Sequence, residues 1–367
     1  MDDEELARRF RESARGAGRR APLYRRFGEA IADDPETARL LLHAPADQRM
    51  PVLLYACVHW ILLREPGHEL RRWYPNLTVR RAEKPPGGDP YPAFREFCAR
   101  NEERLAGLLA ERTTQTNEVG RCALFLPVLA EVAAGDRPIA HLDVGASAGL
   151  NLLLDRYRYR YEPDDGTGET HTVGGPSTIG GSTVELVCGT RGDVPLPRAV
   201  PPIADRIGLD QSPIDVTRTA DADWLRACVW PDQADRFDRL DRALAVASVD
   251  PPPIVRGDLV DDLRATVARL DPDAHLVVTA SWVLNYLDAE RRRAFVDTLD
   301  AVAADRDLTW CAAESPTLTA ELPWPAGVAD HDRAHLTHLL RVDWRAGHRT
   351  VAHLAVAHPH GYWLHWA

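Results

Sequence analysis

The chain has 367 residues, of which 45% are hydrophobic and 27% charged, within the range of soluble globular proteins. No apolar run approaches the roughly 18 residues of a membrane span, and a net charge of -11 disfavours binding to nucleic-acid phosphates. Six cysteines without a CxxC pair argue against a disulfide framework or a zinc ribbon. With no signal-like start, we expect a cytoplasmic protein that acts on a small molecule and contacts neither membrane nor nucleic acid; the oligomeric state stays open.

Residues 1–136 predict a helical cap domain. Segments 40–42 and 52–63 are apolar enough for buried helices, and an apolar stripe over 94–109 indicates a third. Prolines and glycines break the loop at 80–92. No strand pattern occurs here, so we expect the sheet to begin after this region.

The segment TTQTNEVGR, at 113–121, precedes an apolar helix over 122–132. Thr116 or Asn117 could cap that helix, and Glu118 in its first turn would complement the helix dipole. Alternatively, Gln115, Asn117, Glu118 and Arg121 form the wall of a ligand pocket. Both interpretations remain open from the residues alone.

The segment IAHLDVGASAGLNLLLD, at 139–155, predicts a strand, a tight turn and a helix. Ile139, Leu142 and Val144 form a short apolar run, and a turn of small residues follows at 145–149. Leucines at helical spacing then predict a helix from residue 150. Its first amides would point to the space beyond the carboxyl end of the strand, where open α/β sheets bind ligands.

An insertion at about 156–200 follows. The run RYRYRYE, at 156–162, alternates with the period of a strand, which places arginines on one face and tyrosines on the other. We expect a charged edge hairpin with 184–188 in preference to a base-stacking surface; it could also cover the pocket as a lid.

Four further strands are predicted, each followed by a polar residue. They cover 203–209 before Asp210, 254–255 before Asp258, 275–279 before Ser281, and 308–313 before Glu314. The segment 344–366 predicts two strands joined at HPHG, whose His358 and His360 we expect to be exposed. The fold class is therefore α/β, with a mostly parallel sheet over 137–367 and a C-terminal antiparallel hairpin.

The ordered strand ends DVGASAG, GLDQSP and RGDLVDDL, followed by HLVVTASWVLNYL, resemble the class I methyltransferases, which have a Rossmann-like fold and use S-adenosylmethionine. Ser147 stands where that family has the middle glycine of the turn, and the insertion lengthens the gap from Asp143 to Asp210. The resemblance implies that S-adenosylmethionine is bound by Asp143, Gly145, Ala146, Ser147, Gly149, Asn151, Asp210, Asp258, Leu259 and Ser281.

That resemblance implies methyl transfer to a small molecule by alignment of the acceptor with the cofactor methyl group. Glu314 and Glu118 are the candidate bases, needed where the acceptor must lose a proton. The candidate acceptor contacts are Asn117, Arg121, Trp282, Asn285 and Tyr286. A protein of the same fold that binds a nucleotide-like ligand without catalysis, or serves as a scaffold, is the alternative.

At closer range, TQTNEVGR and DVGASAGLNLLLDRYRYRY resemble a bacterial family catalogued only as a domain of unknown function. This resemblance spans most of the chain and implies no particular reaction.

Two other interpretations compete. GASAG also fits GxSxG, the nucleophile elbow of α/β hydrolases, with Ser147 as nucleophile and Glu314 or Asp258 plus a late histidine as partners. His331, His335 and His338 would share one face of a helix, where metal ligation is conceivable. Without an HExxH pattern we favour a solvated helix face, and we expect no metal site.

Overall fold

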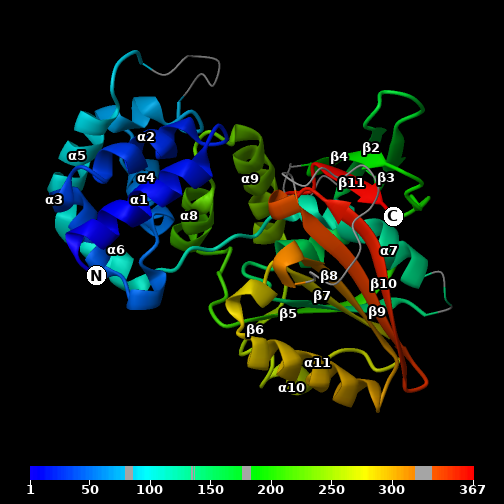
Figure 1. Ribbon diagram of the computed structural model, residues 1–367. Helices are drawn as coiled ribbons and strands as arrows, with labels where there is room; N and C mark the ends of the chain where they lie inside the picture. The colour runs from blue at the N-terminus through cyan, green and yellow to red at the C-terminus, as the bar shows by residue number, and fades with distance from the viewer. Residues whose placement is uncertain (79–85, 134, 136, 176–182, 319–332) are drawn as a thin grey trace. The chain divides into compact units, whose positions relative to one another are not determined.

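The computed structural model describes the chain except residues 79–85, 134, 136, 176–182 and 319–332 (Figure 1). Contacts divide it into two compact units. The first contains Met1–Thr116 and Arg218–Asp241, and the second contains Asn117–Thr217 and Arg242–Ala367. Within the described residues, no helix is both long and apolar enough to cross a membrane.

The first unit is helical throughout its described residues, as the sequence predicts for the N-terminal region. Its elements are α1 (Asp3–Ala17), α2 (Pro22–Ile31), α3 (Pro35–Ala38), η1 (Arg39–His43), η2 (Ala46–Gln48), α4 (Pro51–Arg64), η3 (Glu69–Trp73), α5 (Tyr91–Arg100), α6 (Glu102–Glu111), α8 (Thr219–Cys228) and the first half of α9 (Ala234–Val249).

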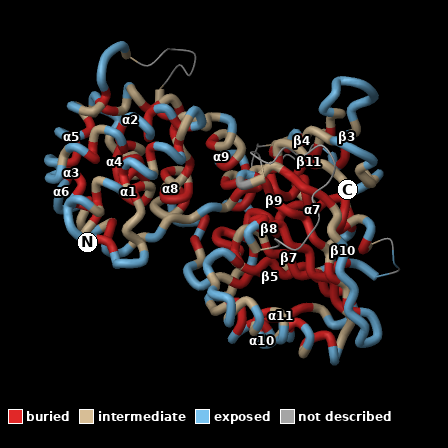
Figure 2. Tube along the Cα trace, in the orientation of Figure 1, coloured by how far each residue is buried: buried red, intermediate tan, exposed pale blue. Residues whose placement is uncertain are grey.

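Local sequence explains these helices. Asp2 caps α1 by accepting a hydrogen bond from the amide of Glu5 at 2.8 Å, and Pro51 opens α4 at a position where a missing N–H costs nothing. Helix α4 is buried around almost its whole circumference and forms the centre of this unit (Figure 2). The apolar stripe over 94–109 belongs to two helices, α5 and α6, which are separated at Asn101.

The second unit is an α/β structure around one sheet. Its strands are β1 (Ile139–Val144), β2 (Arg158–Pro163), β3 (His171–Val173), β4 (Glu185–Arg191), β5 (Ile203–Asp210), β6 (Ile254–Arg256), β7 (His275–Ser281), β8 (Leu308–Glu314), β9 (Thr337–Arg345), β10 (His348–Ala357) and β11 (Trp363–Trp366). They lie in the order β3-β2-β4-β11-β10-β9-β8-β7-β1-β5-β6.

Most neighbouring strands in this sheet are parallel, including the central run from β6 through β5, β1 and β7 to β8. The pairs β2/β3, β8/β9, β9/β10 and β10/β11 are antiparallel. The predicted fold class and the hairpin at HPHG are therefore confirmed.

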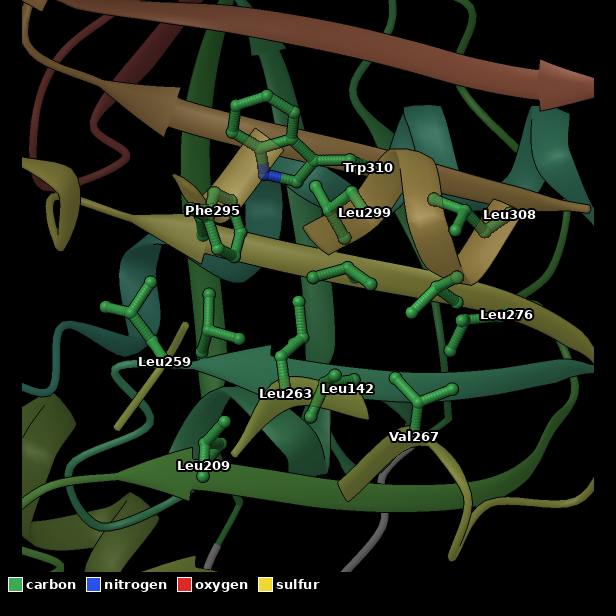
Figure 3. Close-up of a cluster of buried hydrophobic side chains, with 14 of the residues drawn as sticks. Leu142, Leu209, Leu259, Leu263, Val267, Leu276, Phe295, Leu299, Leu308 and Trp310 are labelled. Carbon is green, nitrogen blue, oxygen red and sulfur yellow. The ribbon is translucent and has the colours of Figure 1, made fainter. Parts of the chain in front are cut away.

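Helices cover both faces of the sheet. On one face, α10 (Leu263–Val267) and α11 (Ala289–Ala303) bury Leu263, Phe295 and Leu299 against Leu142 and Trp310 of the strands (Figure 3). Helix α7 (Cys122–Val132) lies on the other side (Figure 1). Short helices η4 (Val119–Arg121), η5 (Leu150–Arg156), η6 (Leu284–Tyr286), η7 (Pro316–Leu318) and η8 (Arg333–His335) join these elements.

Two details differ from the sequence predictions. The segment after the glycine turn is the 3₁₀ helix η5, which is kinked at Leu153. Strand β2 pairs with β4 in parallel, since the short strand β3 reverses the chain between them. The tyrosines of β2 are buried and its arginines half-buried, as the alternation predicts.

Strand β9 was not predicted, and it changes the interpretation of the late histidines. His338 lies in β9 opposite Glu314 of β8, so no helix joins it to His335. His331 lies outside the described residues. The shared helical face proposed for the three histidines is therefore wrong at His338.

Candidate functional site

The direction of the chain through the sheet reverses next to β1. After the insertion that contains β2, β3 and β4, the chain forms β5 and β6 on one side of β1, and β7 and β8 then lie on the other side. Because β1 runs parallel to both β5 and β7, their carboxyl ends meet at one edge of the sheet. Such a reversal point is where open α/β sheets bind ligands. This edge is the candidate site.

The turn after β1 is closely packed and has an unusual backbone. Gly145, Ser147 and Gly149 have φ values of 70°, 54° and 68°, in the left-handed region. A Cβ on Gly145 would lie 2.4 Å from a methyl carbon of Val283, so only glycine fits there. Ser147 is a non-glycine residue held in this conformation, which is a form of strain that often marks functional sites.

The amides of this turn are largely satisfied within the protein. Those of Gly145 and Ala146 donate to the carbonyl of Leu209, and that of Leu150 donates to Oδ1 of Asn117 at 2.9 Å. Among the described residues, the amide of Ala148 has no acceptor. In the same part of the chain, the buried hydroxyl of Ser147 has no hydrogen-bond partner either.

Asp210 joins the end of β5 to the glycine turn. Its Oδ2 accepts a hydrogen bond from the amide of Ser147 at 2.8 Å, and its Oδ1 accepts one from the amide of Ser212 at 2.7 Å. The residue is half-buried. Each carboxylate oxygen has a second lone pair, so Asp210 can accept further hydrogen bonds from a ligand.

Asp258 and Leu259 are differently placed. The carboxylate of Asp258 accepts from the amides of Val260 and Asp261 and pairs with Arg291. These partners hold the pKa of Asp258 below its usual value despite partial burial. Leu259 is buried in the core that α10 and α11 form with the sheet. Both residues therefore have structural partners of their own.

Asp143, near the end of β1, is a buried acid. Its Oδ1 accepts a hydrogen bond from the hydroxyl of Thr279 at 2.7 Å. Burial raises the pKa of Asp143 to about 7, helped by the charge of Asp210 and opposed by Thr279 and by the charge of Arg121. Through this hydrogen bond the carboxyl group of Asp143 joins β1 to β7.

Glu314, the last residue of β8, is 1% exposed. Its Oε1 accepts hydrogen bonds from the amides of Val283 and Leu284, at 3.1 and 3.4 Å. Its buried Oε2 has no hydrogen-bond partner among the described residues. Burial raises the pKa of Glu314 to about 7, although these amides and the charge of Arg121 lower it. A carboxyl group of this kind can gain or lose a proton near neutral pH.

Arg121 is a buried positive charge of the site and is 6% exposed. Its Nη1 donates to the carbonyl and the hydroxyl of Ser281, at 3.0 and 2.8 Å. Its Nε donates to the carbonyl of Pro359 at 2.8 Å, and its guanidinium lies 6.0 Å from the ring centroid of Trp282. Arg121 thus ties the segment before α7 to the end of β7 and to the HPHG turn.

Asn117 and Glu118 lie in the same segment before α7 as Arg121. Asn117 caps η5 through Leu150, so it acts as a cap, but for a different helix from the one predicted. Glu118 accepts from the amide of Gly120, and its Oε2 lies 3.5 Å from Nδ1 of His360. Asn117 thus contacts the helix that follows the glycine turn, and Arg121 contacts Ser281 at the end of β7. That these residues form the wall of a ligand pocket stays a prediction. Gln115 belongs to the first unit.

The remaining predicted site residues differ in their burial and contacts. Asn151 is buried, with its Oδ1 3.5 Å from the sulfur of Cys122. Trp282 has a φ of 57°, and its indole donates to the hydroxyl of Thr337 at 2.6 Å. Asn285 is exposed, and Tyr286 is 77% exposed, so neither is packed into the strand ends.

The sequence did not indicate the HPHG turn as part of the site. His360 was expected to be exposed but is half-buried against Glu118. The turn crosses the segment before α7 so closely that a Cβ on Gly361 would lie 2.0 Å from the carbonyl oxygen of Gly120. No local pattern predicts a contact between residues so far apart in the chain.

A comparison with curated proteins gave no match. A family model described as "Uncharacterized protein conserved in bacteria (DUF2332)" matches residues 7–366. This agrees with the resemblance to a bacterial domain of unknown function that the segments around residues 117 and 145 indicate. The chain therefore belongs to this DUF2332 family.

Proposed function

We propose that the protein binds S-adenosylmethionine at the carboxyl ends of β1 and β5 and transfers its methyl group to a small molecule. The observation that carries this proposal is the junction of Asp210 with the glycine turn at a reversal point of the sheet. There, a half-buried carboxylate with free lone pairs lies beside a turn that still has an unused amide and an unused hydroxyl.

These groups fit the chemistry of the cofactor. Asp210 would accept hydrogen bonds from the ribose hydroxyls, since a carboxylate can take two donors at once. The hydroxyl of Ser147 and the amide of Ala148 would bind the methionine carboxylate. In this proposal Asp258 and Leu259 shape the edge of the sheet and make no direct contact with the cofactor. Asp258 is bound by a backbone amide, and Leu259 is packed in the core.

The cofactor supplies an activated methyl group, so the protein needs to align the acceptor and remove a proton where the acceptor carries one. Glu314 is suited to that task, because its pKa of about 7 leaves it partly ionised near neutral pH and its Oε2 has no partner among the described residues. Arg121 favours the ionised form of Glu314. Glu118 is the weaker candidate base, since it caps η4 and lies beside His360.

The hydrolase alternative has less support. A serine nucleophile needs a base within hydrogen-bond distance, and no described residue is a partner of the Ser147 hydroxyl. Asp258 and Glu314, its candidate acids, bind backbone amides and no histidine in the described chain. Failure of a fluorophosphonate probe to label Ser147 would agree with this assignment.

Mass spectrometry of ligands that co-purify with the protein, followed by calorimetric titration with S-adenosylmethionine and S-adenosylhomocysteine, tests the proposal. We expect saturable binding of both compounds. Binding of a different nucleotide-like ligand at this edge would support the non-catalytic alternative, and absence of binding at millimolar concentrations would contradict the methyltransferase proposal.

A further inference from the structure

Three tyrosines in the core of the helical unit have hydroxyl groups without a hydrogen-bond partner among the described residues. They are Tyr24 of α2, Tyr55 of α4 and Tyr74, which follows η3. Their exposures are 3%, 1% and 0%, so bulk water does not reach them. A buried hydroxyl without a partner costs about 1–3 kcal/mol, which makes three in one core a feature that requires an explanation.

These tyrosines belong to one cluster. The rings of Tyr24 and Tyr55 are 4.6 Å apart, and Phe27 lies 6.4 Å from both Tyr55 and Tyr74. The hydroxyl oxygen of Tyr55 would lie 3.1 Å from a Cβ on Gly28. Burial raises the pKa of Tyr24 and of Tyr74, and the nearby charges of Tyr55 and Asp232 raise both further.

The second unit of the same chain provides an internal comparison. Tyr157, Tyr159 and Tyr161 are as deeply buried, and their hydroxyls donate to backbone carbonyls of Leu150, Leu154 and Ala123 at 2.7, 2.6 and 2.8 Å. Buried tyrosine hydroxyls usually have such partners. Phenylalanine fills equivalent space elsewhere in the helical core, at Phe10, Phe27 and Phe94.

Asn76 adds a hydrogen-bond acceptor beside the cluster, because it bonds to His59, whose ring centroid lies 5.1 Å from that of Tyr74. The Nδ1 of His59 lies 3.0 Å from the carbonyl of Ala227, so Nδ1 carries the proton and Nε2 accepts from Nδ2 of Asn76 at 3.0 Å. Because burial lowers the pKa of His59 to about 4, the ring is neutral and this orientation of the amide holds. The buried Oδ1 of Asn76 then has no donor among the described residues.

We propose that Tyr24, Tyr55, Tyr74 and Asn76 bind a small uncharged molecule that both donates and accepts hydrogen bonds, in the interior of the helical unit. Hydroxyls can donate to it, and the Asn76 oxygen needs a donor from it, so a carboxylate or an ammonium ion alone would not satisfy the set. Water, as an ordered cluster, and a small polyol share this chemistry. The inference is independent of the proposed methyl transfer.

The sign of a stability change tests the proposal. If the hydroxyls bind a ligand, Tyr55→Phe and Tyr74→Phe each remove a used hydrogen bond, and the full-length protein should melt about 2 °C or more below the parent. If they are bare, removing the hydroxyl leaves the melting temperature unchanged or raises it, which would overturn the proposal. Tyr91→Phe is the matched control, because the Tyr91 hydroxyl donates to Asp34 at 2.7 Å and its loss must lower stability.

A crystal structure of the full chain gives the second test and does not depend on how the variants fold. Ordered density bridging the hydroxyls of Tyr24, Tyr55 and Tyr74 would support the site, and an empty, dry core would overturn it. Mass spectrometry of the supernatant after denaturation then distinguishes the two candidate ligands, a small polyol and water. Release of a polyol in stoichiometric amount identifies a bound metabolite, and density without any released compound identifies water.

Discussion

The backbone amide of Ser147 donates a hydrogen bond of 2.8 Å to the carboxylate of Asp210. This bond joins the left-handed turn after β1 to the end of β5, two segments separated by the whole insertion that contains β2, β3 and β4. It explains how a serine can occupy the middle position of the turn, since the strained backbone is held by a charged acceptor.

Gly145→Ala should destabilise the protein for two separable reasons. The φ of 70° costs an alanine about 1–2 kcal/mol, and the contact of its Cβ with Val283 adds about 1–3 kcal/mol. Gly347→Ala is the control, because Gly347 has a φ of 78° and nothing within 4 Å of its Cβ position. Urea unfolding should show a larger loss for Gly145→Ala. Equal losses would mean that the packing against Val283 is unimportant.

Asn117→Ala should cost about 1 kcal/mol, as removal of a helix cap does, because the amide of Leu150 loses its acceptor. Thermal unfolding measures this loss. Asn285→Ala serves as the comparison, since Asn285 is exposed in η6 and its replacement should change stability by less than about 0.5 kcal/mol. Similar effects at the two asparagines would refute the capping role of Asn117.

Glu314→Gln should change how stability depends on pH. The pKa of Glu314 is about 7 in the folded protein and about 4.3 when unfolded. The folded state therefore holds more protons between these values, and the contribution of Glu314 to stability is present below about pH 4 and lost as pH rises through 7.

Glutamine cannot ionise, so the stability of Glu314→Gln relative to the parent should increase from pH 5 to pH 8. Urea unfolding of both proteins at these two pH values measures the change, and the other titrating groups cancel in the difference. A difference that stays constant with pH, or that moves the other way, would show that Glu314 is already ionised at pH 5.

The sequence predicted those parts of the fold that depend on local patterns. The apolar runs that end at Ser281 and Glu314 are strands at the stated places, because a buried parallel strand has a continuous hydrophobic pattern. The parallel pairing of β2 with β4 was not predictable, since it depends on a three-residue strand, β3, with no pattern of its own. Strand β9 was missed because the spacing of its histidine with two earlier ones suggested a helix.

In the candidate site, too, some residues could be placed from the sequence and others could not. Asn117 and Arg121 could be placed near the glycine turn, because they are close to it in the chain and precede a helix that packs on the sheet. The contacts of Arg121 with Pro359 and of Glu118 with His360 join residues more than 200 positions apart, and only the folded chain reveals them. The methyltransferase resemblance implies a cofactor contact for Leu259, and the burial of its side chain in the core could not be predicted from that resemblance.

The most direct test of the proposed function is a parallel calorimetric titration of the parent and of Asp210→Ala with S-adenosylhomocysteine. Asp210→Asn is the control for folding, because it keeps an oxygen that can accept from the amide of Ser147. We predict saturable binding by the parent and at least about tenfold weaker binding by Asp210→Ala, equivalent to about 1.4 kcal/mol. Equal affinities of parent and variant, or no binding by the parent at millimolar ligand, would contradict the account.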